Sequence, residues 1–290
     1  MNSVIASLNS IIAVVGTLTN TLSLSYFINK AKKTLPTRLL ILLNTLDLVS
    51  CIFVAITTLI RHFVEKQVLP MDVLSHYCFE ATGYVTAVLS VTRSISLCLP
   101  FYRVNGKLIA FSFLPLPFWM VTKAVVCYFD YSRSGNSDTF NRASATELVL
   151  MMVTIVIANT ISVVELSKRS AEIGAVSESS KQATVTVLII SVLFCIANSV
   201  WVGGLIAPIC ASEDDKKTLV FEILTGMPWI LVPFNSALNP GIYFWRKRAM
   251  REYARELFQN LFRMLDYRRA DRHPGAEDSQ EATVEQSSTI

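Results

Sequence analysis

Charged residues are scarce in this chain of 290 residues: Asp, Glu, Lys and Arg make up 17% of it, and 52% of the residues are hydrophobic. Soluble globular domains carry about 25% charged residues. The mean hydropathy of the chain is also positive. So little charge excludes an ordinary soluble domain and predicts a protein that crosses a membrane several times.

Histidine is scarce too, with three residues in the whole chain. His62 and His76 are expected at the outer ends of helices. Paired carboxylates, histidine clusters and Ser/His/Asp sets do not recur, and the cysteine spacings do not match a metal site. We therefore predict no enzymatic activity, no cofactor and no structural metal.

Seven apolar runs are long enough to cross a hydrocarbon layer of about 30 Å as helices. They span residues 4–29, 37–61, 72–99, 107–128, 145–168, 181–209 and 218–244. The strands of membrane barrels alternate polar and apolar residues over roughly ten positions, and these runs do not. We expect an all-α membrane protein, a seven-transmembrane helix bundle with a C-terminal amphipathic helix, in residues 1–265. A disordered cytoplasmic tail is expected in residues 266–290.

The basic residues are unevenly distributed between the segments that join these runs. With the N-terminus outside, 19 of the 26 Lys and Arg residues lie on the inner side. The first run has neither a basic leader nor a small-residue cleavage site, so we expect it to be retained as a helix. The predicted protein is a multi-pass plasma-membrane protein with a cytoplasmic C-terminus. The net charge of +4 reflects this topology, and no nucleic-acid partner is expected.

The last apolar run ends in Asn239-Pro240-Gly241-Ile242-Tyr243, with Asn235-Ser236 just upstream. A proline inside a helix frees the carbonyl one turn earlier, and we expect the asparagine directly before it to satisfy such a group. A basic amphipathic segment, 244–262, follows and indicates a helix on the inner leaflet. The combination resembles the end of the seventh helix of rhodopsin-like (class A) G-protein-coupled receptors, of which this chain would be a divergent orphan.

Asp47 is the most informative polar residue of the second run. A carboxylate at mid-membrane costs several kcal/mol unless it is paired, hydrated or protonated, so it should face the bundle interior. A structural, hydrogen-bonded acid is the simple alternative. The resemblance implies a water-filled pocket that holds an allosteric sodium ion. The residues that match this pocket are Asn20, Asp47, Thr82, Asn235, Ser236 and Asn239.

Arg93 closes the third run, and Pro100 follows seven residues later. An isolated arginine at a helix end would simply extend to the interface, but this spacing is similar to that of the family's Asp-Arg-Tyr motif. Thr92 replaces the acid and cannot form an ion pair, so we hypothesise a less restrained resting state. The resemblance assigns coupling to a G protein to Arg93, Pro100, Asn239, Pro240 and Tyr243.

The cysteines depart from the family pattern. Cys78 stands 15 residues before Arg93, about ten fewer than in the family. Either Cys78 is not the family's cysteine, or this helix has lost a segment. Cys78, Cys127 and Cys210 lie toward the oxidising side and allow three pairings, with Cys78–Cys127 as the candidate disulfide. The sixth run also lacks the family's Cys-Trp-x-Pro switch.

The ligand is constrained mainly by exclusion. Because residues 219–243 contain no lysine, a retinal Schiff base is excluded, and Ser75 occupies the position of the aspartate of amine receptors. Three polar groups in or near the outer half are candidate ligand contacts, although they could equally pair with one another or with water. These groups are Glu80, Lys123 and Glu222.

The resemblance implies a receptor that passes the signal of an extracellular peptide or chemosensory molecule to a heterotrimeric G protein. Arrestin is a further partner implied by the family, and Ser288-Thr289-Ile290 matches a PDZ-binding C-terminus. The alternative is a seven-helix transporter or a non-coupling membrane protein. Transporters usually contain internal repeats, and the sequence has none.

Overall fold

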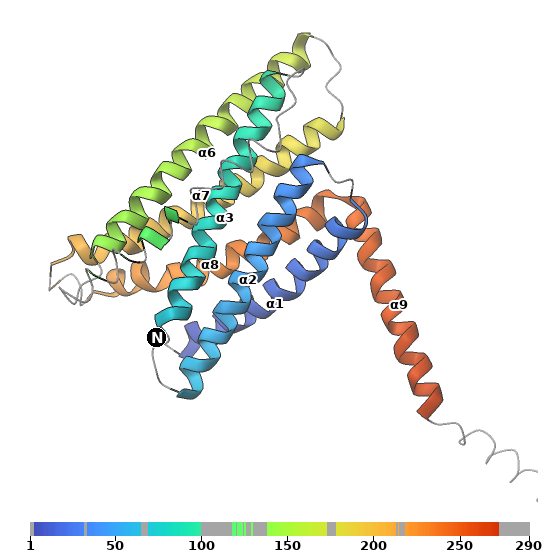
Figure 1. The fold of residues 1–290 in the computed structure, drawn as a ribbon, viewed down its shortest axis with the longest axis horizontal. Helices are drawn as coiled ribbons and strands as arrows, with labels where there is room; N and C mark the ends of the chain where they lie inside the picture. Colours follow the sequence, from blue (N-terminus) through green and yellow to red (C-terminus); the bar gives the residue numbers. More distant parts are fainter. Residues whose placement is uncertain are drawn as a thin grey trace, which may run out of the picture. The chain divides into compact units, whose positions relative to one another are not determined.

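The computed structural model describes residues 3–31, 34–64, 69–99, 118–119, 121–123, 125, 129, 138–172, 178–212, 214 and 218–272. Within these ranges the chain forms helices and no strand, which confirms the all-α class (Figure 1). The helices are α1 (Ser3–Asn29), α2 (Leu35–Val64), α3 (Leu69–Cys98), α6 (Asp138–Glu172), α7 (Glu178–Cys210), α8 (Leu219–Arg246) and α9 (Arg248–Arg272).

Six of the seven expected runs coincide with helices α1, α2, α3, α6, α7 and α8. The fourth expected run, 107–128, lies mostly outside the described residues; those that are described there are helical. Among the described helices, α1, α2, α6 and α7 are long and apolar enough to cross a membrane. The chain is therefore compatible with a membrane protein, and the full set of seven spans stays a prediction.

The helices of the first compact unit, Met1–Arg246, pack in a closed order. Helix α1 contacts α2, α2 contacts α3, and α3 contacts both α6 and α7. Helix α7 then contacts α8, which returns to α1 and α2 (Figure 1). Residues far apart in the sequence therefore meet inside this unit, above all those of α1 and α8.

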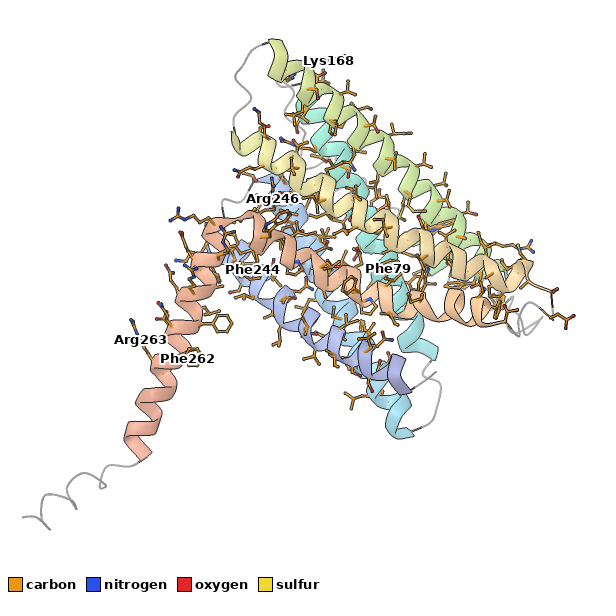
Figure 2. The ribbon with its side chains drawn as sticks, turned by 180° about the vertical axis from the view of Figure 1, so that it is seen from behind. Phe79, Lys168, Phe244, Arg246, Phe262 and Arg263 are labelled. Atoms are coloured by element: carbon orange, nitrogen blue, oxygen red, sulfur yellow. The ribbon has the colours of Figure 1, made fainter. Side chains whose placement is uncertain are left out.

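An aromatic cluster fills the interior between α3, α6 and α7. Phe79 of α3, labelled in Figure 2, lies with its ring centroid 6.2 Å from that of Phe194 and 5.8 Å from that of Trp201. A Cβ atom at Gly83 would lie 2.6 Å from Cζ of Phe194. Glycine at this position therefore allows the Phe194 ring to pack directly against the backbone of α3.

Gly16 brings α1 close to two other helices, as expected from its place in an apolar helix. A Cβ atom at this position would lie 2.6 Å from Sγ of Cys51 on α2 and 3.2 Å from Cβ of Ala237 on α8. Gly203 on α7, in contrast, has no atom within 4 Å of such a Cβ. The two glycines therefore form a matched pair, one at a close contact and one in open space.

We expect Gly16→Val to lower the free energy of unfolding by about 1 to 3 kcal/mol, because overpacking forces the contacting helices apart. Gly203→Ala is the control and should leave stability unchanged or raise it slightly, since alanine favours helix. Thermal unfolding of the detergent-solubilised protein measures both. Equal midpoints for the two variants would show that α1 does not need this close contact.

The second compact unit, Lys247–Ile290, contains α9. Its exposed Leu257, Phe258 and Leu261 accompany basic residues, and Phe262 and Arg263 project from different sides of the helix (Figure 2). The expected amphipathic helix is confirmed, but it ends at Arg272, beyond the expected boundary at 265. The first helix-breaking pair, Pro274-Gly275, comes only after this point.

Candidate functional site

The buried carboxylate of Asp47 joins three helices. Asn239 of α8 donates from Nδ2 to Oδ2 of Asp47 at 2.7 Å. Thr82 of α3 donates from Oγ1 to Oδ1 at a longer 3.4 Å. The expectation that Asp47 faces the interior is confirmed, because its side chain is fully buried. The hydrogen-bonded structural acid and the family's polar pocket both agree with these contacts.

Pro240 determines how α1 joins this polar cluster. Proline has no N–H, so the carbonyl of Ser236, four residues earlier, loses its helical donor. Asn20 of α1 replaces that donor, with its Nδ2 3.0 Å from the Ser236 carbonyl oxygen and 2.9 Å from that of Gly16. We had expected Asn239 to satisfy the freed carbonyl. That expectation was wrong, because the Asn239 amide turns toward the stronger acceptor, the Asp47 carboxylate.

Two buried polar atoms of this cluster, Asn20 Oδ1 and Asn235 Nδ2, have no hydrogen-bond partner among the described residues. The Ser236 hydroxyl lies close enough to the Asp47 carboxylate to interact with it. Roughly nine in ten buried polar groups in proteins are hydrogen-bonded. The cluster therefore combines one carboxylate with an unused oxygen acceptor, which is the chemistry of a site for ordered water or a hard cation.

Arg93 is held by two hydroxyl residues at the start of α7. Its Nε and Nη2 donate to Thr184 Oγ1 at 2.9 and 2.7 Å. Nη2 also donates to Ser180 Oγ at 2.6 Å and to the Ser180 carbonyl at 2.5 Å. A second polar contact, Ser90 Oγ to Ser191 Oγ at 3.1 Å, links the same two helices further along. The guanidinium is thus restrained by α7, although Thr92 offers it no ion pair.

Tyr243 of α8 lies in the interior of the first compact unit. Its ring is fully buried and packs edge-to-face on Phe27 of α1, with centroids 5.3 Å apart. Pro240 is buried as well. Pro100, the third coupling residue expected on the inner side, lies outside the described residues.

A buried ion cluster joins α3, the helical residues near 123, and α6. The Lys123 ammonium pairs with Glu80 and lies 3.1 Å from Oε2 of Glu147. The three side chains are exposed by only 2%, 1% and 14%, respectively. Trp119 Nε1 donates to the same Glu147 oxygen at 3.0 Å, and the ammonium lies over the Phe140 ring. Glu80 and Lys123 therefore pair with each other, which is one of the two alternatives left open; the side chain of Glu222 lies outside the described ones.

The candidate disulfide between Cys78 and Cys127 lies partly outside the described residues and stays a prediction. Cys78 is a free, buried thiol, and Cys210 is free as well. Cys127 lies outside the described residues. Helix α3 begins at Leu69, nine residues or about 14 Å before Cys78. Cys78 therefore lies more than two turns inside α3 and one turn from Thr82, and the 30-residue length of α3 favours the alternative that Cys78 is not the family's cysteine.

Sequence reasoning missed the partners of Arg93 and Lys123. Ser180, Thr184 and Ser191 stand at spacings of four and seven residues, which place their hydroxyls on one face of a helix. That pattern was available in the sequence. The sequence did not indicate Glu147 as a partner of Lys123, because an acidic residue near the end of a helix is usually solvated and needs no buried partner.

No model of a known protein family matches the chain, and no curated protein matches it either. Function is therefore inferred from the motifs of the sequence and from the contacts described above, chiefly those of Asp47, Asn239, Asn20, Arg93 and Thr184.

Lys123→Met should lower the free energy of unfolding by about 3 to 5 kcal/mol, because it leaves two carboxylates buried without a cation. Replacing both acids as well, in Lys123→Met with Glu80→Gln and Glu147→Gln, should recover most of the loss. Arg169→Met is the control, since it breaks the partly exposed pair with Glu165 and should cost at most about 1 kcal/mol. Unfolding midpoints measured in detergent test these expectations. A triple variant that is no more stable than Lys123→Met would contradict the ion cluster of Lys123, Glu80 and Glu147.

Proposed function

We propose that this protein is a divergent rhodopsin-like receptor of the plasma membrane that transmits an extracellular peptide or chemosensory signal to a heterotrimeric G protein. The observation that carries this proposal is the attachment of Arg93 on α3 to Ser180 and Thr184 on α7. These residues lie at the ends of their helices, where the resemblance expects G-protein coupling. The N-terminus is proposed to be outside and the C-terminus inside.

The contact between Arg93 and α7 provides a two-state element. While the guanidinium binds Ser180 and Thr184, these ends of α3 and α7 stay together. Movement of α7 away from α3 breaks these hydrogen bonds and opens a cleft for the G protein. Ligand and G protein would each favour the open state by binding it more tightly.

The polar cluster around Asp47 fits an allosteric sodium ion. Asp47 supplies a negative charge, Asn20 supplies an amide oxygen without a partner in the described chain, and the Ser236 hydroxyl oxygen lies beside the carboxylate. A bound cation would compensate the buried charge and favour the arrangement in which α1, α2 and α8 stay close. Asp47, Ser236 and Asn20 are the residues that would hold it.

The decisive experiment measures basal nucleotide exchange on a panel of Gα subunits, after an N-terminal tag has confirmed that the protein reaches the cell surface. Exchange with one Gα class that is lost in Arg93→Ala would establish coupling. The receptor proposal would be overturned if the wild type and the Thr184→Val variant, in which the contact of Arg93 with α7 is weakened, both reached the surface and neither drove exchange on any Gα.

Thr184→Val should raise basal exchange by about tenfold, because removing a hydroxyl that accepts from a charged donor costs the closed state about 1.5 kcal/mol. Thr186→Val is the matched control: it removes a hydroxyl from the same helix whose bond goes only to the Gln182 carbonyl. It should leave exchange unchanged. An equal rise in both variants would mean that the hydroxyl of Thr184 does not restrain Arg93.

Sodium should raise the unfolding temperature relative to an equal concentration of choline, because a ligand that binds only the folded state stabilises it. Asp47→Asn should remove this difference, since it deletes the charge while keeping the side-chain shape. Thr45→Val is the control, because Thr45 bonds only to the Ile41 carbonyl on the same helix. A sodium effect that survives Asp47→Asn would place the ion elsewhere.

The buried cluster of Glu80, Lys123 and Glu147 is the observation that favours the second candidate, an ion-coupled transporter. Intramembrane ionisable groups commonly mark ion or proton pathways. In a transporter, Glu80→Gln would abolish uptake while Arg93→Ala would not. In a receptor, Arg93→Ala would abolish nucleotide exchange while Glu80→Gln would not. The two variants therefore distinguish a receptor from a transporter.

A further inference from the structure

A groove of about 400 Å³ lies between α6 and α7. Its volume falls within the range of about 300 to 1,000 Å³ that is typical of small-molecule sites. Both helices are among the candidate membrane spans. Asn159, which lines the groove, stands ten residues or about 15 Å from the end of the α6 span at Arg169. The groove therefore lies at hydrocarbon depth.

Asn159 is the exceptional residue of this groove. Its side chain is buried, with 8% exposed, yet the described part of the chain provides no hydrogen-bond partner for its amide. The other polar groups of the lining are satisfied: Thr160 donates to the Val156 carbonyl at 2.8 Å, and Ser191 bonds to Ser90. An amide without a partner in hydrocarbon costs several kcal/mol. Asn159 therefore presents one unused donor and acceptor set to whatever enters the groove.

The walls of the groove indicate the chemistry of the part of the occupant that does not contact Asn159. No charged side chain lines it, and its walls are mainly Val, Ile and Leu. Val192 and Ile196 on α7 are about half exposed, so the groove opens to the side. Because Asn159 is nine-tenths buried, we expect a slender group to reach its amide more readily than the broad face of a second helix.

We propose that this groove binds an uncharged, single-chain lipid whose head group both donates and accepts a hydrogen bond, as a primary amide does. The head pairs with the Asn159 amide, and the chain lies along the apolar walls of α6 and α7. Since α7 also carries Ser191 and Thr184, the occupant contacts the helix that is attached to α3. The site does not depend on the receptor proposal, because binding is measured without a G protein.

The test uses the full-length protein in nanodiscs and an 18-carbon primary amide that carries a diazirine and an alkyne. We expect saturable crosslinking to residues 155–164 or 188–196 that the unlabelled amide competes away. Asn159→Leu should weaken binding by about tenfold, as expected for the loss of about 1.4 kcal/mol. Thr154→Val is the matched control and should bind normally, because Thr154 lies on α6 outside the groove lining and its hydroxyl already donates to the Leu150 carbonyl.

A groove-filling variant provides a second, independent measurement. Val192→Trp places a bulky side chain in the groove and should abolish crosslinking to both segments. Undiminished labelling of Asn159→Leu or of Val192→Trp would overturn the proposal. A lipid-free wild-type dimer that Asn159→Leu converts to a monomer would also overturn it, since the occupant would then be a second copy. Failure of the exchange assay, in contrast, would leave this result untouched.

Discussion

The missing N–H of Pro240 is the constraint on which the arrangement of α1, α2 and α8 depends. It leaves the Ser236 carbonyl open, and Asn20 crosses from α1 to fill it. The Asn239 amide is then available to donate to Asp47. Next to the break in its backbone hydrogen bonding, α8 is therefore bonded to α1 through Asn20 and to α2 through Asp47. Gly16, one turn before Asn20, permits the close approach that this contact requires. Backbone chemistry at one residue thus determines the packing of three helices.

Hydroxyl and amide groups perform a similar task between α3 and α7. Hydrogen bonds of Arg93 with Ser180 and Thr184, and of Ser90 with Ser191, join two helices that also pack through aromatic rings. Apolar packing alone allows helices to slide or rotate at little cost, whereas a hydrogen bond specifies a position. The polar contacts therefore specify one register, and a change of register must break them. Such a pair of helices is suited to two discrete states.

The sequence predicted the helical parts of the fold well, because apolar length and charge distribution are local signals. The burial of Asp47 followed from the cost of a carboxylate in hydrocarbon, and its contact with Asn239 agrees with the pocket that the family motif implied. The partners of Arg93 were not predicted, since uncharged Ser180 and Thr184 carry no charge signal. The burial of the free Cys78 thiol was not predicted either, because a cysteine in a sequence carries no signal of its burial. Distances along a helix fix depth only when both of its ends are known.

Helix α3 carries Glu80 and Arg93 and is not among the four described helices that are apolar enough to cross a membrane by themselves. The cation that neutralises Glu80 belongs to a later segment, at Lys123, and Glu147 follows later still. During synthesis, α3 therefore emerges before the groups that make its burial favourable. In the proposed seven-helix bundle, α3 would insert into the membrane only after these later segments have been made, so that its insertion would be a late, cooperative event of biogenesis.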